Sequence, residues 1–134
     1  MSNEALRIDL HVHSFFSDGV LLPSELVQRA LLKGHRVLAI TDHADSSNLE
    51  ELAEQLLRFV EEQGDDWPLR FVPGVELTHV APRRIAPLAE RAKALGLRLV
   101  VVHGETIVEP VAAGTNAAGV ECPHVDILAH AGLI

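Results

Sequence analysis

Short apolar runs alternate along the chain with segments in which apolar residues recur every three or four positions. The runs have the length of strands, and the periodic segments are typical of helices with one apolar face. We expect strands at residues 7–13, 36–41, 69–75, 98–103 and 125–129. We expect helices at residues 23–33, 48–64 and 82–95, and a short helix around 108–118.

Residues with special backbone properties mark the ends of these helices. Pro23 stands in the first turn of the first helix, and Gly34 follows its last turn. Asn48 has Glu51 three residues later, which predicts a capping box at the start of the second helix. Pro87 must lie near the first turn of the third helix or bend it, because proline disrupts a helix interior.

Strands that are apolar throughout, separated by amphipathic helices, predict an α/β fold with a parallel sheet buried on both faces. A doubly wound sheet and a β/α barrel both fit this pattern. A complete barrel of eight units takes roughly 250 residues, or about 31 per unit. The 134 residues therefore provide about four to five βα units in one domain, as an open sheet or as part of a barrel. Pro73–Gly74 predicts a bend in the third strand.

Composition narrows the class of protein. The chain is 48% hydrophobic with no Tyr and one Trp, so its core is expected to be aliphatic. Eleven Lys and Arg against nineteen Asp and Glu give a net charge of -8, which argues against nucleic-acid binding. No apolar run is long enough to cross a membrane. Cys122 is the single cysteine, which fits a cytoplasmic location, and we interpret it as a small buried filler.

The eight histidines are unevenly placed. All five predicted strands have metal-ligand residues at or just beyond their carboxyl ends. These residues are His11 and His13, Asp42 and His43, Glu76, His103, and His130. The carboxyl ends of parallel strands share one edge, so the side chains are expected to converge there. One buried histidine is more often a hydrogen-bonded core residue, but five strands that end in this way favour a metal site.

The spacing of individual residues supports this interpretation. Alternate residues of a strand point to one face, so His11 and His13 are placed to bind one ion. Imidazole suits Zn, Mn and Fe, and a carboxylate such as Glu76 can bridge two ions. Asp18 lies in a Ser-Asp-Gly turn signal and is either a turn former or a ligand. Asp42 either holds the backbone or binds metal directly.

The other polar residues near these strand ends have less specific interpretations. His79 lies just beyond Glu76 and is a candidate substrate contact. Asp9 is expected to orient a neighbouring residue or to pair structurally, and His35, after the helix stop at Gly34, to be a surface or capping residue. His124 follows a proline in a loop and has no predicted role in the site.

Five segments carry these residues in a fixed order. They are DLHVHSFFSDG (9–19), ITDHAD (40–45), PGVELTHV (73–80), VVVHGETIVEPV (100–111) and DILAHAGLI (126–134). Together they resemble the PHP (polymerase and histidinol phosphatase) family of metal-dependent phosphoesterases. The resemblance covers essentially the whole chain. The HGETIVEP stretch is most similar to small stand-alone members described as histidinol-phosphatase-like.

The resemblance implies a distorted seven-unit β/α barrel with two to three divalent ions at its carboxyl edge. The implied ligand sets are His11, His13 and Glu76; Glu76, His103 and His130; and His43 with Asp18. It also implies hydrolysis of a small phosphate ester such as histidinol phosphate by a water whose pKa the ions lower. His79, Thr115 and Asn116 are candidates for orienting the substrate, although the last two are equally typical of turns.

Members of the family continue beyond the fifth strand to a late Asp-x-His, which completes the first and third metal sites. This sequence stops at Ile134, so we expect the N-terminal part of a PHP domain, with weak or no activity by itself. An incomplete barrel leaves its first and last strands with open edges, which predicts a homo-oligomer.

Three other functions are alternatives to a phosphoesterase. A metal-binding module without catalysis is the alternative that the missing ligands favour. A metal-dependent amidohydrolase also uses His-x-His after its first strand, but that family usually has a lysine after a middle strand, and no strand end here carries one. A Rossmann-type nucleotide binder is excluded because no Gly-x-Gly-x-x-Gly follows the first strand.

Overall fold

The computed structural model describes residues 5–132 and contains parallel strands alternating with helices. The strands are β1 (Arg7–Val12), β2 (His35–Ile40), β3 (His43–Ala44), β4 (Arg70–Leu77), β5 (Leu99–His103) and β6 (Ile127–Ala129). The helices are α1 (Pro23–Leu32), α2 (Leu49–Gln63), α3 (Pro82–Ala94) and α4 (Thr115–Glu121). The prediction of an α/β fold is confirmed.

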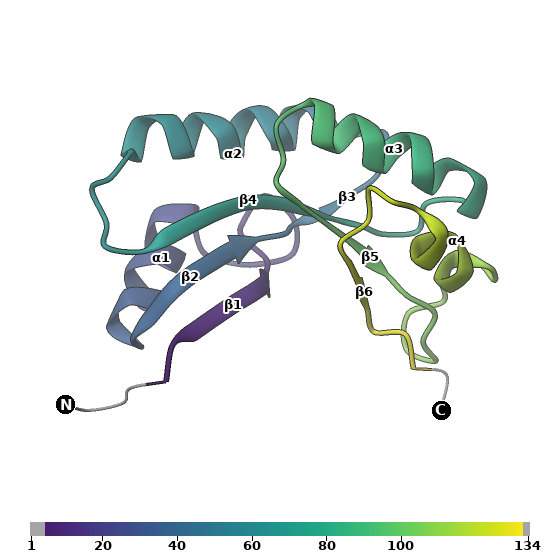
Figure 1. Cartoon of the computed structure of the whole chain (residues 1–134), viewed down its shortest axis with the longest axis horizontal. Coiled ribbons are helices and arrows are strands. Elements are labelled where there is room, and N and C mark those ends of the chain that lie inside the picture. The colour runs from purple at the N-terminus through teal and green to yellow at the C-terminus, as the bar shows by residue number, and fades with distance from the viewer. Residues whose placement is uncertain (1–4, 133–134) are drawn as a thin grey trace.

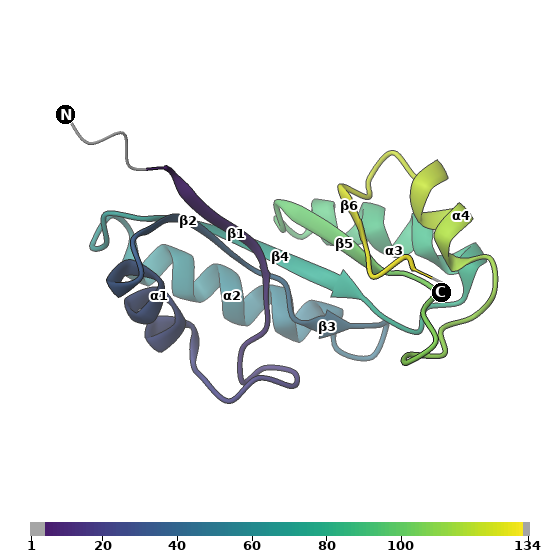
Figure 2. The ribbon, with the colours of Figure 1, turned by 90° about the horizontal axis from the view of Figure 1, so that it is seen from below.

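The order of the strands decides between the two expected architectures. The sheet runs β1-β2-β4-β5-β6, with β3 beside β4, and every pairing is parallel. Neighbours in the sheet thus follow one another in the chain, whereas a doubly wound sheet reverses its order at a switch point. Figure 1 shows the sheet curling below α2 and α3, with β1 and β6 at its two ends. Figure 2 shows the same half-barrel from below. The chain forms part of a β/α barrel.

Strand β4 joins the two halves of this sheet. It pairs with β2 up to Pro73 and with β5 from Gly74 onward, so its partner changes where the sequence predicted a bend. A Cβ at Gly74 would lie 2.8 Å from the Leu99 carbonyl oxygen and 2.9 Å from Thr41 Cγ2. Only glycine lets the strands approach so closely. The strand extends beyond the predicted residue 75, so Glu76 lies inside β4.

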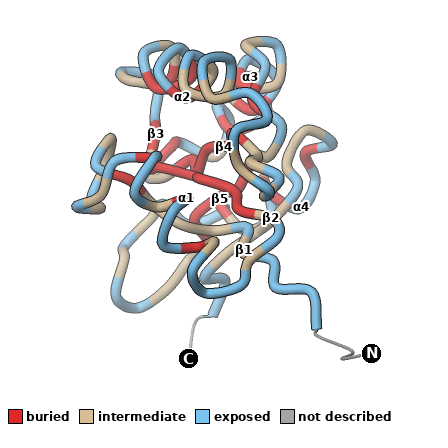
Figure 3. The backbone as a smooth tube through the Cα atoms, turned by 90° about the vertical axis from the view of Figure 1, so that its left-hand side faces the viewer, coloured by how far each residue is buried: buried red, intermediate tan, exposed pale blue. Residues whose placement is uncertain are grey.

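The core lies between the sheet and the helices that cover its outer face. Figure 3 shows the buried segments along the middle of the sheet and on the sides of α2 and α3 that face it. Helix α2 contributes Leu49, Leu52 and Leu56, which are at most 2% exposed. Cys122 is buried in the same core, as predicted. Aliphatic side chains dominate, and such burial stabilises the domain by about 25 cal/mol for each Å² of apolar area removed from water.

The start of α2 differs from the expected capping box. Asn48 makes no side-chain bond to the helix. Its Oδ1 accepts a hydrogen bond from the Asp45 backbone N–H (2.9 Å), and its Nδ2 donates to the His43 carbonyl (3.1 Å). The amide therefore closes the turn after β3, a two-residue strand that the sequence pattern did not predict because it is too short to show a period.

The fourth helix differs from expectation, and Pro87 has the second of its two expected positions, inside the helix. Helix α4 begins at Thr115 because residues 104–114 form a loop that ends at Gly114 with a left-handed φ of 94°. Pro87 lies inside α3, beyond its first turn. No helix among residues 5–132 is long and apolar enough to cross a membrane.

The two outer strands suggest self-association. Within the described residues, β1 pairs with β2 alone and β6 with β5 alone, so each strand has a free edge. Ile8 and Leu10 of β1 are 50% and 38% exposed. We expect a homo-oligomer formed through these edges, because pairing would satisfy backbone groups and cover apolar side chains.

Sedimentation velocity at micromolar concentration is the measurement that tests this expectation. The chain should sediment as a species heavier than 14.6 kDa, and Ile8→Lys should shift it toward the monomer. Leu32→Lys, on exposed α1 surface, is the control that should leave the mass unchanged. A single well-folded species of one chain's mass would contradict self-association.

Candidate metal centre

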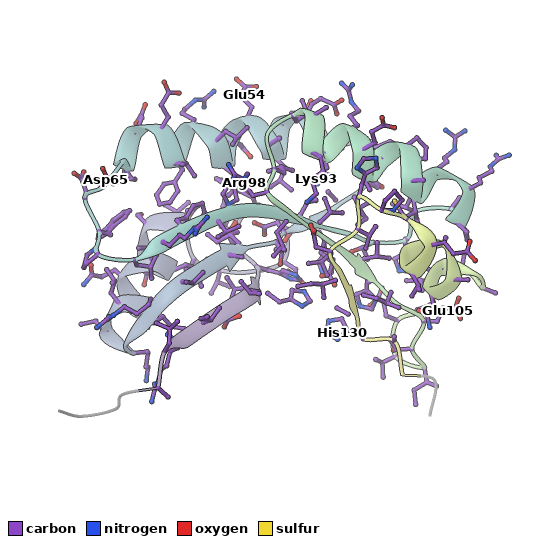
Figure 4. The ribbon with its side chains drawn as sticks, in the orientation of Figure 1. Glu54, Asp65, Lys93, Arg98, Glu105 and His130 are labelled. Carbon is purple, nitrogen blue, oxygen red and sulfur yellow. The ribbon has the colours of Figure 1, made fainter. Side chains whose placement is uncertain are left out.

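The carboxyl ends of the strands converge on Glu76, a carboxylate near the end of β4 that is 0% exposed. The side chains around it come from the ends of four other strands. They are His11 and His13 from β1, His43 from β3, His103 from β5, and His130 immediately after β6. Figure 4 labels His130 at the end of β6, on the side of the sheet away from α3. The structure thus brings together the residues that the sequence analysis placed at this edge.

The imidazole nitrogens lie close to the two oxygens of the central carboxylate. Glu76 Oε1 is 3.1 Å from His11 Nε2, 2.9 Å from His13 Nε2 and 3.4 Å from His43 Nδ1. Glu76 Oε2 is 3.8 Å from His130 Nε2. The His11 and His130 rings are 5.2 Å apart, so the two outer strands nearly meet at this edge although their other ends diverge.

Two groups of three residues have ligand atoms within 4.8 Å of one another. They are His11, Glu76 and His130, and His13, Asp18 and His43. His103 adjoins the first group, with its ring 4.8 Å from that of His130. The first group therefore contains His11 and His130 from the two outer strands. The family resemblance instead implied that His11, His13 and Glu76 bind one ion. The assignment of residues to individual ions stays a prediction.

The centre has the polar groups that a cation would satisfy. Both Glu76 oxygens and His13 Nε2 are buried and make no hydrogen bond of acceptable geometry in the described structure. Buried polar atoms are almost always paired, and an unpaired buried carboxylate is costly. Burial by itself would raise the pKa of Glu76, but the close approach of His11 and His13 outweighs it and holds this pKa far below its usual range. Imidazoles around an ionised carboxylate form a suitable donor set for a divalent transition metal.

Neighbouring groups determine which ring nitrogens are free to bind an ion. The Thr78 hydroxyl donates its one proton to the Glu76 carbonyl (3.1 Å) and therefore accepts from His43 Nδ1 (2.6 Å). In the neutral ring, Nε2 of His43 then has the lone pair, and it lies 3.2 Å from Asp18 Oδ2. Two lone pairs facing each other at this distance need a proton or a cation between them.

The ring nitrogens of His103 and His13 also have partners that affect which of them can bind an ion. His103 Nδ1 donates to the Gly104 carbonyl (3.0 Å), because a carbonyl only accepts, and this leaves Nε2 unprotonated. His13 Nδ1 lies 2.7 Å from Asp18 Oδ1, while its Nε2 is directed to Glu76. The contact with Glu76 raises the pKa of His13, against the effect of burial and with support from Asp18. Without an ion, His13 is therefore protonated more readily than an ordinary histidine.

Asp42 holds the loop that carries Asp18. It is fully buried and accepts hydrogen bonds from the Ser14 backbone N–H (2.7 Å), the Ser14 hydroxyl (2.7 Å) and the Ser17 hydroxyl (2.5 Å). This is the backbone-supporting role that was one of two expected for Asp42. A Cβ at Gly19 would lie 2.5 Å from the His13 carbonyl oxygen, so the Ser-Asp-Gly turn requires glycine there.

The remaining predicted residues lie outside the cluster or support it. Asp9 accepts a hydrogen bond from the His11 backbone N–H (3.1 Å), which fits its expected orienting role. The His35 ring contacts a carbonyl near the end of α1 (3.2 Å), also as expected. Thr115 and Asn116 bond to groups of the loop before α4 and act as turn formers.

His79 does not join the metal-ligand cluster. Its Nε2 lies 2.6 Å from Glu109 Oε1, on the loop that follows β5. Its role as a substrate contact stays a prediction.

Three polar residues of the site were not singled out from the sequence. Ser14 and Thr78 orient Asp42 and His43, and Glu109 binds His79. Ser14 and Thr78 each lie within two residues of a predicted ligand, and this proximity is the only signal for them in the sequence. Glu109 is distant from His79 in the chain, so only the fold reveals this pair.

Comparison with known proteins finds one family and several relatives that match the chain. Residues 9–96 match the family described as "PHP domain". The chain is 51% identical over 130 residues to the uncharacterized protein MJ1295 of Methanocaldococcus jannaschii, an alignment that covers 96% of this chain and 60% of that protein. It is 34% identical over 122 residues to the 3',5'-nucleoside bisphosphate phosphatase of Chromobacterium violaceum, covering 85% of this chain and 40% of that enzyme.

A further relative, the 5'-3' exoribonuclease Rnm of Escherichia coli, is 37% identical over 79 residues, covering 59% of this chain and 25% of that protein. The chain thus spans about three fifths of the first relative and two fifths of the second. No solved structure matches it.

Removal of the central carboxylate is expected to remove most of the bound metal. Glu76→Ala deletes both oxygens around which the histidines lie, whereas Glu90→Ala removes an exposed glutamate of α3 and is the matched control. The measurement is elemental analysis of each protein after loading with Zn²⁺ or Mn²⁺ and desalting. Equal metal content in the two variants would contradict a shared site at Glu76.

Loss of the Asp42 carboxylate is expected to lower both the stability of the fold and the metal affinity. In Asp42→Asn one acceptor oxygen is replaced by a donor, so at least one of the Ser14 and Ser17 bonds is lost. We expect a loss of about 1–3 kcal/mol in the free energy of unfolding and a metal affinity roughly 10–100-fold weaker. Urea denaturation and metal titration measure the two effects, and an unchanged metal affinity would show that the loop does not depend on Asp42.

Proposed function

This chain belongs to the PHP domain family, and from that premise we propose that it is a divalent-metal-dependent phosphoesterase. The observation that carries the proposal is the buried Glu76 carboxylate, whose oxygens lack hydrogen bonds while imidazoles from neighbouring strands approach them. A clustered donor set of this kind is typical of hydrolytic sites with more than one metal ion. The likeness to a bisphosphate phosphatase supports the same reaction class.

We assign two to three ions, Zn, Mn or Fe, to this centre. One would lie among His11, Glu76 and His130 and one among His13, Asp18 and His43, with His103 completing the first or binding a third. When bound, such ions hold phosphoryl oxygens and lower the pKa of an attacking water.

The protein groups position the ligands around these ions. Glu76 supplies negative charge between the two groups, which reduces the repulsion between neighbouring cations. Thr78 and the Gly104 carbonyl would hold the Nδ1 atoms of His43 and His103, which would leave Nε2 of each neutral ring as the atom able to bind an ion. Asp42 keeps Asp18 in place through Ser14 and Ser17.

Histidinol phosphate is the first substrate to test, because the HGETIVEP segment resembles histidinol-phosphatase-like proteins. A nucleoside 3',5'-bisphosphate is the second, because one relative is named for that activity. The chain spans only part of each of these relatives, and its own turnover is part of the proposal.

The experiment measures phosphate release by the chain loaded with Mn²⁺ or Zn²⁺. Because the late Asp-x-His of the family is missing from this sequence, we expect only weak release from at least one of the two substrates, loss of that release on chelation, and recovery when metal is restored. Glu76→Ala should lower the rate more than tenfold, since it removes metal, while Glu90→Ala should not. Stoichiometric metal binding without hydrolysis of any phosphate ester would contradict the proposal and identify a metal-binding module without catalysis.

A further inference from the structure

A cavity of about 500 Å³ opens beside the proposed metal centre. His103 and His130 form one side of it, and Ile107, Val108 and Glu109 of the loop after β5 form another. Its size lies within the range of small-molecule sites, which are mostly apolar with a few polar groups that give specificity. A phosphoryl group bound at the metal centre would direct its ester group into this cavity.

The loop that forms the outer wall is held in shape by its own polar groups. The Thr106 hydroxyl oxygen accepts hydrogen bonds from the backbone N–H groups of Val108 (3.0 Å) and Glu109 (3.2 Å). The Glu105 carboxylate accepts one from the Gly114 N–H (2.6 Å) and so ties the far end of the loop. The loop nevertheless leaves Ile107 and Val108 76% and 83% exposed at the cavity. These side chains would be covered by the apolar part of an ester group.

Glu109 is the acidic residue among those that line the cavity. A residue of a different loop fixes its position, because His79 Nε2 lies 2.6 Å from Glu109 Oε1. His79 has a φ of 56°, a left-handed conformation that residues other than glycine adopt infrequently and often at functional sites. The contact with His79 lowers the pKa of Glu109 below its usual value, so this carboxylate is ionised at neutral pH.

We propose that Glu109, positioned by His79, recognises a protonated amine on the ester group of the substrate. This inference rests on the proposed phosphoesterase function and adds the substrate class. An apolar cavity with one fixed carboxylate fits an ester group that has a short apolar part and an ammonium group. Hydrogen bonds from an ammonium to a carboxylate are charge-assisted and shorter and stronger than neutral ones. His79 is a positioning residue, since it acts through Glu109.

The test compares the affinities of the Mn²⁺-loaded chain for three probes by isothermal titration calorimetry. The probes are inorganic phosphate, propyl phosphate and 2-aminoethyl phosphate, and the last two are of similar length but differ in the ammonium group. We expect the native chain to bind 2-aminoethyl phosphate about tenfold more tightly than propyl phosphate, the ratio that a hydrogen bond between charged groups typically provides. The ratio of the two affinities is the readout, so general effects on phosphate binding cancel.

Glu109→Gln should reduce this ratio to about one, whereas Glu121→Gln, which removes an exposed carboxylate of α4, should keep it. His79→Ala should lower the ratio in the same way. His79→Gln should restore part of it, because the glutamine amide can still donate to Glu109.

Three further results would contradict the inference, and they are distinguishable. Phosphate binding with equal affinity for propyl and 2-aminoethyl phosphate would overturn the role of Glu109 and leave the phosphoesterase proposal intact. Failure of the metal-loaded chain to bind inorganic phosphate would overturn both. A tenfold preference for 2-aminoethyl phosphate that persists in Glu109→Gln would show that another group binds the amine.

Discussion

The buried carboxylate of Glu76 is the constraint on which the arrangement of the site depends. An ionised carboxylate at 0% exposure is unfavourable unless positive charge or hydrogen-bond donors surround it. Here the surrounding groups are imidazoles from both outer strands and from β3, and several of their nitrogens are directed at the carboxylate without forming hydrogen bonds. The carboxyl edge of the barrel is thus organised around a charge that the chain alone does not fully compensate. A divalent cation would supply that compensation.

The fold brings the groups together by aligning strand ends, and the loops then refine their positions. Parallel pairing in chain order places each strand's carboxyl end at the same edge. Two of the histidines are also oriented by a neighbour, since Thr78 contacts His43 Nδ1 and the Gly104 carbonyl contacts His103 Nδ1. Such partners commonly determine metal affinity as strongly as the ligands themselves. The dependence on Asp42 follows the same rule, because the loop that it holds carries Asp18.

Two parts of the barrel edge are proposed to bind different parts of the substrate. In the proposed function, the histidine cluster and Glu76 would bind the phosphoryl group, which all members of a substrate class share. The loop after β5, with its apolar side chains and with Glu109 beside His79, would bind the ester group that differs between substrates. Changes in this loop would therefore alter the choice of substrate without changing the metal ligands. This arrangement is common in β/α barrels, where loops at the carboxyl edge vary over a constant scaffold.

The amino-acid sequence alone determined the alternation of strands and helices, the α/β class, the approximate element boundaries and the ligand types at strand ends. These follow from local periodicity and residue chemistry, which need no knowledge of distant contacts. The choice between a doubly wound sheet and a barrel required the strand order, which is a property of pairing between segments far apart in the chain. The strand β3 was missed because two residues are too few to show a period. The turn-closing role of Asn48 and the later start of α4 were missed because hydrogen bonds across loops outweigh local preferences there. The pairing of His11 with His130 and of His79 with Glu109 likewise depends on the curvature of the sheet, which brings together side chains that no spacing in the sequence relates.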